Sequence, residues 1–442
     1  MKKKKIVLFV FLLIGVLSLI LTYKLKQNSL NKNKPVKEEK LSIMIKEDGA
    51  TDYTKSNSKD IPKGSYTLNT EKSYCKNNGK IEGYDNIAGT VSFAFIGTDR
   101  CFLYFDYYSG TKGWETILLN NGNGSTTVDE AKAYIISKGT PNLTVTATEN
   151  EGMYATEDDQ GTSYYFRGAV DNNWIKFGAI SGKSIYWRII RINGDGSIRM
   201  IYTGTTAPTE SQKVVMTETS TRISAVKFNS NYDKAEYVGY KYEIGKQHGL
   251  ANDSTIKTTI DNWYKTTSLF LDFPNYTLND IVADSPFCYD RSASTSTTGT
   301  YGEIDSWAST GTKYYYGSYG RIFGNKTGPS LKCQNELDLF SYNTRNGNGT
   351  LTYPVGLITV DEIMFAGGIN SANNSYYLYT GLDYWTGSPV VPEVMFAVLQ
   401  NGAPAPFVFK DNNLGVRPVI SLSSKAKLSG DGTWNNPYVV HG

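Results

Sequence analysis

Histidine is scarce in this chain: the 442 residues include two, and only His248 lies away from the C-terminal end. No C-x-x-C pair accompanies it, so the four-ligand set of a zinc site is missing. The G-x-x-x-x-G-K pattern that cradles phosphates and the G-x-S-x-G pattern of serine hydrolases are missing as well. We therefore expect no metal and no cofactor, and the sequence offers no enzyme motif.

Cysteine is also rare. The four residues fall into two local groups, Cys75 with Cys101 and Cys288 with Cys333. Four cysteines allow three pairings, and the sequence does not choose among them. Pairing within each group is the simplest arrangement, and disulfides persist outside the cell. We therefore expect disulfides and an extracellular location.

An excess of positive charge is missing from most of the chain, although its net charge is +3. Residues 1–40 contain ten lysines and two glutamates, so the remainder is net acidic. Nucleic-acid binding requires a basic excess that neutralises phosphates, and we do not expect it here. What is abundant is tyrosine, with 33 residues, and glycine, with 42. This composition is typical of an extracellular β-rich protein.

One long apolar run is present, Ile6–Tyr23, with 18 residues and no charge. At about 1.5 Å per residue it would form a helix of about 27 Å, close to the thickness of the bilayer core. Lys2–Lys5 precede it, so the positive-inside rule places residues 1–5 in the cytoplasm and the bulk of the chain outside. A cleaved signal peptide is the alternative, but Thr22-Tyr23-Lys24 is a poor cleavage site. We expect an uncleaved, single-pass anchor in the cell membrane.

Composition divides the rest of the chain into four segments. Residues 24–65 are polar and predict a flexible stalk. Residues 66–110 alternate apolar and polar side chains and predict a small β module stapled by a disulfide. Residues 111–150 form a connector with one short helix near Val128–Ile136. Residues 151–442 form a large head domain.

The stretch Ile185–Tyr202 predicts a β-hairpin at the centre of the head. Asn193–Gly196 tolerates the positive φ of a tight turn, and apolar side chains occupy both faces of the flanking strands. Such a hairpin belongs inside a sheet, and Gly415–Leu422 is the expected neighbouring strand. Trp187 is expected to have a structural role there.

Two helices are indicated in the head. Asp253-Ser254 begins one, and Thr359–Glu362 has the spacing of a capping box that begins the other. Strands separate these helices, which predicts an α+β fold with an antiparallel sheet and two short helices. Asp284–Thr350 is an unusually long loop region for a compact domain, and such regions are often functional.

Several blocks of the head together resemble a family of uncharacterised surface proteins from Firmicutes and the related wall-less Mollicutes, over roughly Glu151–Val440. The blocks are G-T-S-Y-Y-F-R-G-A-V at 161–170, W-R-I-I-R-I-N-G-D-G-S-I-R at 187–199, G-L-I-T-V-D-E-I at 356–363, Y-W-T-G-S-P at 384–389 and G-V-R-P-V-I-S-L at 415–422. The resemblance implies a C-type-lectin-like head, similar to the sulfatase-modifying-factor group. Fold alone does not imply function.

The activities of that fold can be checked against this sequence. Calcium-dependent lectins use E-P-N or Q-P-D with W-N-D, whereas this chain has Trp434-Asn435-Asn436 and neither tripeptide. Formylglycine-generating enzymes need a reactive cysteine pair near the C-terminal strands, and no cysteine follows Cys333. The resemblance therefore supports neither activity.

Charged residues give three further candidates. Arg188 and Arg417 lie in apolar strands, as do Arg191 and Arg199, and need carboxylate or carbonyl partners if they are buried. Structural ion pairs explain them better than a clamp for an anionic ligand, and we expect Arg188 and Arg417 to be structural. The acids Glu157-Asp158-Asp159 are the basis of a hydrolase alternative. Asp195 and Asp431 are expected in turns, because the loop pattern of a calcium site is missing.

Aromatic side chains are the candidate ligand-binding residues, since amphipathic rings suit exposed recognition of sugars. They are Tyr314, Tyr315, Tyr316, Tyr319, Tyr384 and Trp385. The expected protein is a membrane-anchored extracellular binding or adhesion protein for a glycan or protein ligand, and not an enzyme. The alternatives are an extracellular hydrolase acting on glycans and a structural component of the envelope.

Overall fold

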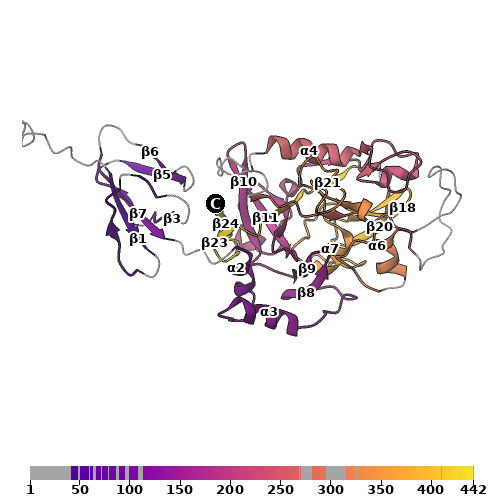
Figure 1. Cartoon of the computed structure of the whole chain (residues 1–442), viewed down its shortest axis with the longest axis horizontal. Helices are drawn as coiled ribbons and strands as arrows, with labels where there is room; N and C mark the ends of the chain where they lie inside the picture. Colours follow the sequence, from indigo (N-terminus) through magenta and orange to yellow (C-terminus); the bar gives the residue numbers. More distant parts are fainter. Residues whose placement is uncertain are drawn as a thin grey trace, which may run out of the picture. The chain divides into compact units, whose positions relative to one another are not determined.

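The computed structural model describes residues 41–47, 50–58, 60–62, 66–70, 72–77, 79–85, 89–94, 99–107, 113–267, 269, 281–294, 315–324, 327–409 and 411–441. The expected anchor Ile6–Tyr23 and Tyr314 lie outside these residues. In the part that is described, no helix is long and apolar enough to cross a membrane. The chain separates into two compact units, which are described one at a time (Figure 1).

The first unit takes in the chain up to Ile61 together with Leu68–Gly83 and Val91–Asp106. Its main sheet has the order β2-β1-β7-β3, with β4 also paired to β7, and β5 and β6 form a separate pair. The strands are β1 Leu41–Lys46, β2 Thr54–Lys55, β3 Tyr66–Leu68, β4 Tyr74–Cys75, β5 Lys80–Asp85, β6 Thr90–Ala94 and β7 Cys101–Tyr107.

Strand β7 organises this unit because its side chains alternate. Cys101, Leu103 and Phe105 are buried, whereas the residues between them are part-exposed. Strand β1 runs parallel to β7, with Ile43 opposite Leu103. The predicted stalk over residues 24–65 is therefore wrong from Leu41 onward. The apolar residues of Leu41–Lys46 form a strand by pairing with β7, which lies about 60 residues further along the chain. Because the two partners are distant in sequence, no local pattern predicts this strand.

Cys75 and Cys101 form a disulfide, which confirms the predicted staple of the small module. The two residues are also directly paired between β4 and β7. Replacing both by alanine is expected to lower the free energy of unfolding of this unit by about 3 kcal/mol, because the closed loop restricts the unfolded chain. Chemical denaturation of the full chain tests this, and the wild type under reducing conditions is the control. A loss below about 1 kcal/mol would contradict the prediction.

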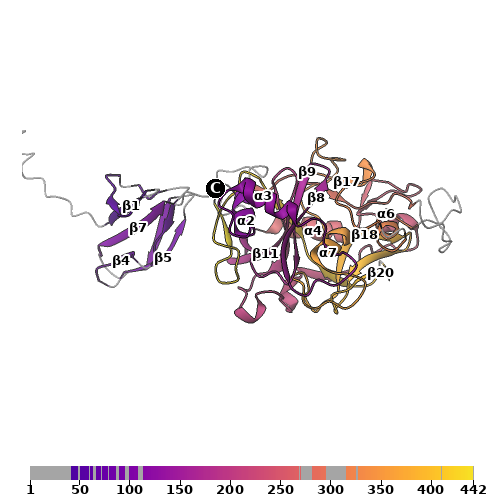
Figure 2. The ribbon, with the colours of Figure 1, turned by 90° about the horizontal axis from the view of Figure 1, so that it is seen from below.

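The second unit, the head, is built on an eight-stranded sheet and a five-stranded sheet (Figure 2). The first has the order β22-β12-β11-β10-β24-β23, with β9 on β11 and β8 on β9; the second has the order β13-β21-β18-β19-β20. The strands of the first are β8 Asn150–Asp158, β9 Gly161–Gly168, β10 Trp174–Ile180, β11 Lys183–Ile192, β12 Ile198–Gly204, β22 Val419–Leu422, β23 Lys427–Ser429 and β24 Tyr438–His441. Those of the second are β13 Ser224–Val226, β18 Tyr384–Val391, β19 Val394–Val398, β20 Pro404–Phe409 and β21 Leu414–Val416.

Short elements complete the head. The described helices are α2 Gly113–Asn120, α3 Val128–Ser137, α4 Thr255–Thr266, α6 Gly317–Tyr319 and α7 Val360–Ala366, with short helical turns that include η4 Gly320–Gly324 and η5 Glu336–Asp338. Two small strand pairs are β14 Lys241–Tyr242 with β15 Asn252–Asp253, and β16 Phe287–Cys288 with β17 Leu339–Phe340. The fold is α+β, with mostly strands and few helices. Because β10–β24 and β18–β21 run parallel, the sheets are mixed rather than wholly antiparallel.

The predicted hairpin is confirmed as β11 and β12, with Asn193–Gly196 at its turn. Strand β22 pairs with β12, so the predicted neighbour of the hairpin is confirmed for Val419–Leu422, whereas Gly415 and Val416 lie in β21 of the other sheet. Gly196 has φ +81°, as the turn requires. Gly194 is needed for another reason: a Cβ there would lie 2.4 Å from the backbone nitrogen of Gly161.

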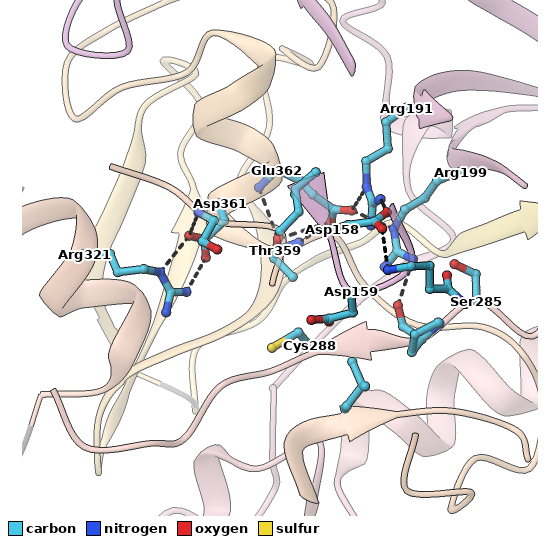
Figure 3. A pocket seen from close by; sticks show the side chains of 15 residues that line it. Asp158, Asp159, Arg191, Arg199, Ser285, Cys288, Arg321, Thr359, Asp361 and Glu362 are labelled. Atoms are coloured by element: carbon cyan, nitrogen blue, oxygen red, sulfur yellow. Dashed lines mark hydrogen bonds and ion pairs between the residues drawn. The ribbon is translucent and has the colours of Figure 1, made fainter. Parts of the chain in front are cut away.

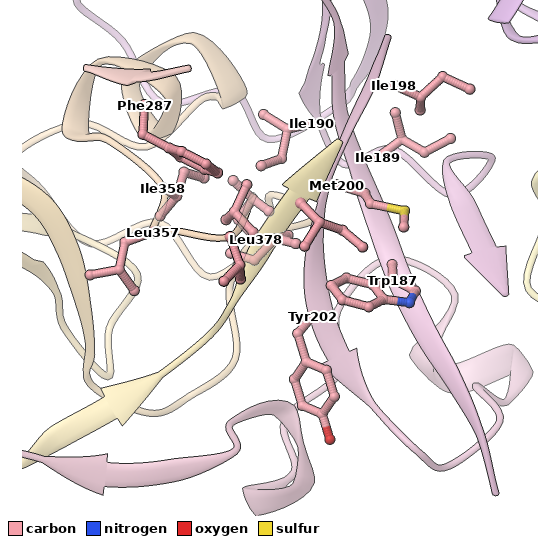
Figure 4. Close-up of a cluster of buried hydrophobic side chains, with 14 of the residues drawn as sticks. Trp187, Ile189, Ile190, Ile198, Met200, Tyr202, Phe287, Leu357, Ile358 and Leu378 are labelled. Carbon is pink, nitrogen blue, oxygen red and sulfur yellow. The ribbon is translucent and has the colours of Figure 1, made fainter. Parts of the chain in front are cut away.

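Both faces of the hairpin are buried, as its apolar residues predict. Figure 4 shows Ile190 turned toward Phe287 and Ile358 on one side, and Ile189 with Met200 on the other. Trp187 has no exposed surface, and its indole N–H donates to the carbonyl of Phe177 at 2.9 Å. Its predicted structural role therefore agrees with its position in the core.

The predicted helix starts are confirmed. The Ser254 hydroxyl accepts from the backbone N–H of Lys257 at the start of α4. At the start of α7, Thr359 and Glu362 make the reciprocal bonds of a capping box, and Gly367, with φ +112°, ends the helix. The expectation of only two helices in the head is wrong, because α6 is also helical and α2 and α3 belong to the head.

The predicted connector over residues 111–150 is part of the head's core. Ile117, Leu118, Ala131 and Ile135 on α2 and α3 have no exposed surface and belong to the main hydrophobic cluster. The helix predicted near Val128–Ile136 is confirmed as α3. The sequence predicted the amphipathic spacing of this helix, but it did not predict that the helix packs into the core of the head.

Candidate functional site

A small pocket lies where the N-terminus of α7 faces the turn between β8 and β9 (Figure 3). Most of its lining is charged or polar. The residues are Asp158, Asp159, Gln160, Arg191, Arg199, Ser285, Pro286, Cys288, Arg321, Ser330, Leu331, Leu339, Thr359, Asp361 and Glu362. The sequence singled out Asp158, Asp159, Arg191 and Arg199 separately, and folding brings them together.

Glu362 is the centre of one half of this network. Its Oε1 lies 3.1 Å from Arg191 Nε and 2.7 Å from Arg199 Nε, although the second contact lacks the alignment of a hydrogen bond. Its Oε2 accepts from the backbone N–H of Thr359 at 2.9 Å. Glu362 therefore caps a helix and lies against two buried arginines, of which Arg191 is also paired with Asp158.

Asp158 joins the hairpin turn to this network. Its carboxylate accepts from Arg191 Nη1 at 2.8 Å and from the backbone N–H of Gly194 at 2.9 Å. The side chain of Asp158 is 6% exposed. This acid is already fully engaged in structural contacts, and the predicted structural ion pairs of Arg191 and Arg199 are present.

The protonation states follow from these contacts. Burial raises the pKa of Glu362, but the guanidinium groups of Arg199 and Arg191 outweigh burial and hold its pKa below the usual value. Burial lowers the pKa of Arg199, and Glu362 opposes that effect. An ionised carboxylate between two guanidinium groups is the stable state at neutral pH.

The other half of the network is centred on Arg321. Its Nη2 lies 3.0 Å from Asp361 Oδ2, and its Nη1 lies 2.9 Å from Asp290 Oδ2. Burial lowers the pKa of Arg321, but Asp361 and Asp290 outweigh burial and raise it overall. Ser318 on α6 and the backbone N–H of Ser330 also bind Asp361. These residues come from three separate segments, and apart from Asp361 in the capping-box segment no sequence motif marked them.

The rim of the pocket carries Asp159 and the second disulfide. Cys288 and Cys333 are bonded, which confirms pairing within each local group. The backbone N–H of Cys333 donates to both oxygens of Asp159 at 3.1 Å. Burial raises the pKa of Asp159, and this hydrogen bond opposes the rise. Asp159 is held against the disulfide rather than aimed across the pocket at a second acid.

The size of the pocket limits its chemistry. The cavity inside the charged lining is about 30 Å³, which has room for about two water molecules. Several of the carboxylates that line it already face arginines. Among the described residues, no group of three or more His, Cys, Asp or Glu side chains is placed to hold a metal ion. The ion pairs of this lining connect α7 to β11 and to the segment that carries Arg321.

The two arginines predicted to be structural are fully buried and bind carbonyls. Arg188 donates to the carbonyls of Val170 and Lys213 and stacks on Trp174, 4.2 Å from the ring centroid. Burial lowers its pKa to about 9, so it stays charged at neutral pH. The expectation of an ion pair is wrong for this residue, because carbonyl oxygens and aromatic faces satisfy the guanidinium instead.

Arg417 connects the two head sheets. Its Nε donates to the carbonyl of Tyr202 on β12 at 3.1 Å, and its guanidinium lies 4.8 Å from the ring centroid of Tyr384 on β18. Arg417 stands between β21 and β22, which belong to different sheets. Carbonyls and an aromatic face satisfy it too, so the expected ion pair is also wrong here.

His248 lies near the second disulfide and is not an isolated loop residue. Its Nδ1 is 2.9 Å from Asp338 Oδ2, and Asp338 also binds Arg291. Asp338 is 90 positions away, so only folding could supply this contact.

Asp195 and Asp431 lie in turns, as predicted. Asp195 accepts from the backbone N–H and the hydroxyl of Ser197, at 2.8 and 2.6 Å. Asp431 makes the same pair of contacts with Thr433, at 3.0 and 2.6 Å. Both are Asx-type turns in which the carboxylate replaces a backbone acceptor.

Half of the predicted aromatic ligand site is core. Tyr316, Tyr384 and Trp385 are each at most 1% exposed. The indole N–H of Trp385 donates to the carbonyl of Val226 at 2.8 Å, and the ring packs edge-on against Phe228. The prediction that these three bind a ligand is wrong, because their neighbours in the two sheets cover them completely.

Tyr315 and Tyr319, the other predicted aromatics that the structure describes, are part-exposed and stacked. The ring centroids of Tyr315 and Tyr319 lie 4.1 Å apart with an interplanar angle of 12°. Phe323 continues the stack at 5.2 Å from Tyr319 and packs on Phe396 of β19. We call Tyr315, Tyr319 and Phe323 the aromatic ladder. The three residues are spaced four positions apart, and side chains at this spacing lie on the same side of a helical segment.

Comparisons of this chain with protein-family models, with curated proteins and with solved structures found no match. The geometry described above is therefore the basis for the functional argument.

Proposed function

We propose that this chain is an extracellular binding protein of a bacterial cell surface, anchored in the membrane by Ile6–Tyr23, whose C-type-lectin-like head binds a glycan. The aromatic ladder carries this proposal. It is a line of part-exposed rings, and two of its three members belong to the set that the sequence singled out. Aromatic faces pack against the apolar faces of sugar rings while their edges and hydroxyls remain hydrated.

The charged pocket supports binding rather than hydrolysis. A glycoside hydrolase needs two carboxylates separated by the scissile bond. Here Glu157 binds Thr162, Asp158 binds Arg191, and Asp159 binds the backbone of Cys333. Each acid has its own partner, so the three residues of the hydrolase alternative do not form a catalytic pair.

Leucine at both Tyr315 and Tyr319 is expected to weaken glycan binding by about tenfold or more, because leucine keeps apolar packing but has no aromatic face. The measurement is a glycan array with the full-length, detergent-solubilised protein, followed by titration with the best ligand. Tyr232→Leu is the matched control, since Tyr232 is 57% exposed and lies outside the ladder.

Two results would contradict the proposal. One is an array that stays blank with folded protein. The other is binding that the ladder variant and the Tyr232→Leu control weaken equally. A protein ligand in place of a glycan is tested by the same variants in a pull-down with purified candidate partners.

A further inference from the structure

The first unit has a second row of aromatic side chains, independent of the head. Tyr74 on β4 pairs with Phe102 on β7, and Tyr104 is two residues further along β7. Paired residues and alternate residues of a strand share a face, so these three lie together. The opposite face of β7 carries the buried Cys101, Leu103 and Phe105.

The rings of this row contact one another. Tyr74 and Phe102 are stacked with centroids 5.0 Å apart and an interplanar angle of 16°. Tyr53 meets Tyr104 edge-on at 5.0 Å. Tyr74 is 49% exposed, and the other three rings are part-exposed. These four aromatic side chains therefore form a row on the solvent-facing side of the first unit's sheet.

Three cations stand over these rings. Lys76 Nζ and the Arg100 guanidinium lie 6.0 and 5.3 Å from the centroid of Phe102. Lys72 Nζ lies 4.8 Å from the centroid of Tyr53. Lys72 and Lys76 are exposed, whereas Arg100 is part-buried. Its Nε is buried without a hydrogen-bond partner among the residues that the structure describes.

Two acids of this unit, Asp99 and Asp106, accept hydrogen bonds from other groups. Asp99 accepts from the backbone N–H groups of Asn77, Gly79 and Arg100, at 2.6 to 3.1 Å. Asp106 accepts from the Tyr53 hydroxyl at 2.7 Å and from the Asn69 amide at 2.9 Å. In the described part of the chain, none of the three cations is ion-paired with a carboxylate. The face therefore presents three cations without a carboxylate ion pair beside aromatic rings, with Asp106 on the same side of β7.

We propose that this aromatic–cationic face, formed by Tyr53, Lys72, Tyr74, Lys76, Arg100, Phe102 and Tyr104, binds an acidic polysaccharide. The exposed rings pack against the apolar faces of sugar rings, and the cations bind carboxylates on the same polymer. Sugar rings and carboxylates alternate along such a polymer, and aromatic rings and cations lie side by side on this face of the protein. This site lies in the other unit and goes beyond the function proposed for the head.

A nucleic acid fits this face less well. Strong binding to a phosphate backbone needs many neutralising cations, and the chain beyond residue 40 is net acidic. A lipid surface is disfavoured because the rings pack on each other along a strand instead of projecting as separate apolar anchors. Both possibilities are outcomes of the experiment below.

The test is titration of the full-length, detergent-solubilised protein with polygalacturonate and with its fully methyl-esterified, uncharged form. Polygalacturonate is expected to bind, with affinity that falls as salt is added, and the esterified form is expected to bind at least tenfold more weakly. Tyr74→Ala and the double variant Lys72→Gln/Lys76→Gln are each expected to weaken polygalacturonate binding by about tenfold. The double variant is also expected to show a smaller salt dependence.

The matched control is Lys227→Gln/Tyr232→Ala, which removes a lysine–tyrosine contact of the head, in which Lys227 Nζ lies 5.8 Å from the ring centroid of Tyr232. It should leave binding unchanged. Thermal unfolding and intact Cys75–Cys101 show that each variant is folded. The proposal is overturned if polygalacturonate does not bind, if it binds all variants equally, or if poly(dT) or phosphatidylglycerol vesicles bind this face more tightly. Tyr315→Leu/Tyr319→Leu should not change polygalacturonate binding, so failure here is separable from failure of the head's function.

Discussion

Replacing Glu362 by glutamine is expected to lower the head's free energy of unfolding by about 3–5 kcal/mol. The glutamine side chain keeps the shape of the cap but removes the negative charge. Arg199 is 1% exposed and Arg191 is 8% exposed, so both would remain as buried charges near a neutral amide. Removing one partner from a buried ion network costs much more than the network itself contributes.

The effect of Glu362→Gln should depend on pH. The pKa of Glu362 in the folded protein lies below its unfolded value of about 4.3. A depressed folded pKa means that ionisation stabilises the fold fully above the unfolded pKa, and that this stabilisation is lost as pH falls through the folded pKa. The stability difference between wild type and variant should therefore be constant near pH 7 and shrink below about pH 4.

Urea denaturation at several pH values measures both effects. Glu157→Gln is the matched control, because Glu157 is exposed and binds only the Thr162 hydroxyl in the described structure. The control should change stability by less than about 0.5 kcal/mol. Equal losses for the two variants, or a Glu362→Gln effect that does not change with acid, would contradict the structural role assigned to Glu362.

Trp385→Ala should have a comparably large effect, a loss of about 3–5 kcal/mol, because it empties a large volume in the core. Trp385 has no exposed surface and contacts Phe228, and its N–H would leave the carbonyl of Val226 without its donor. Were Trp385 a ligand-binding residue, its removal would mainly lower affinity. The structure predicts that it mainly lowers stability.

Two variants calibrate this result. Trp385→Phe keeps most of the ring and should cost less, about 1–2 kcal/mol, through the lost hydrogen bond and a smaller cavity. Tyr232→Ala removes an exposed ring and should cost little. Chemical denaturation followed by circular dichroism ranks the three. A Trp385→Ala protein as stable as Tyr232→Ala would contradict the burial of this side chain.

Local features of the fold were readable in the sequence because they depend on neighbouring residues. The turn Asn193–Gly196 needs residues that tolerate positive φ, and the capping box at Thr359 needs partners three positions apart. The pairing of each cysteine with its nearer neighbour also follows short separations. These features set the hairpin, the helix starts and the two disulfides.

Burial and long-range partners were not readable, because they depend on which strands become neighbours. Sequence marked Glu362 only as a helix cap, whereas its charge balances Arg191 and Arg199, more than 160 positions earlier. Arg321 carried no motif, and Asp361 was marked only as a member of the capping-box segment Thr359–Glu362. A sign of the network was present, however: two adjacent acids begin a helix that is otherwise wholly apolar.

The aromatic residues show the same division. Their abundance predicts a β-rich protein with some aromatic side chains on its surface, but the sequence does not show which aromatic side chains are buried. Packing of the second head sheet buries Trp385, while Tyr319, in the short helix α6, stays part-exposed. Sequence alone determined the turns, the helix caps and the alternating strands, since these follow from local backbone preferences. Only the tertiary structure decided which charges are neutralised and which rings face solvent, because both depend on contacts between segments distant in the chain.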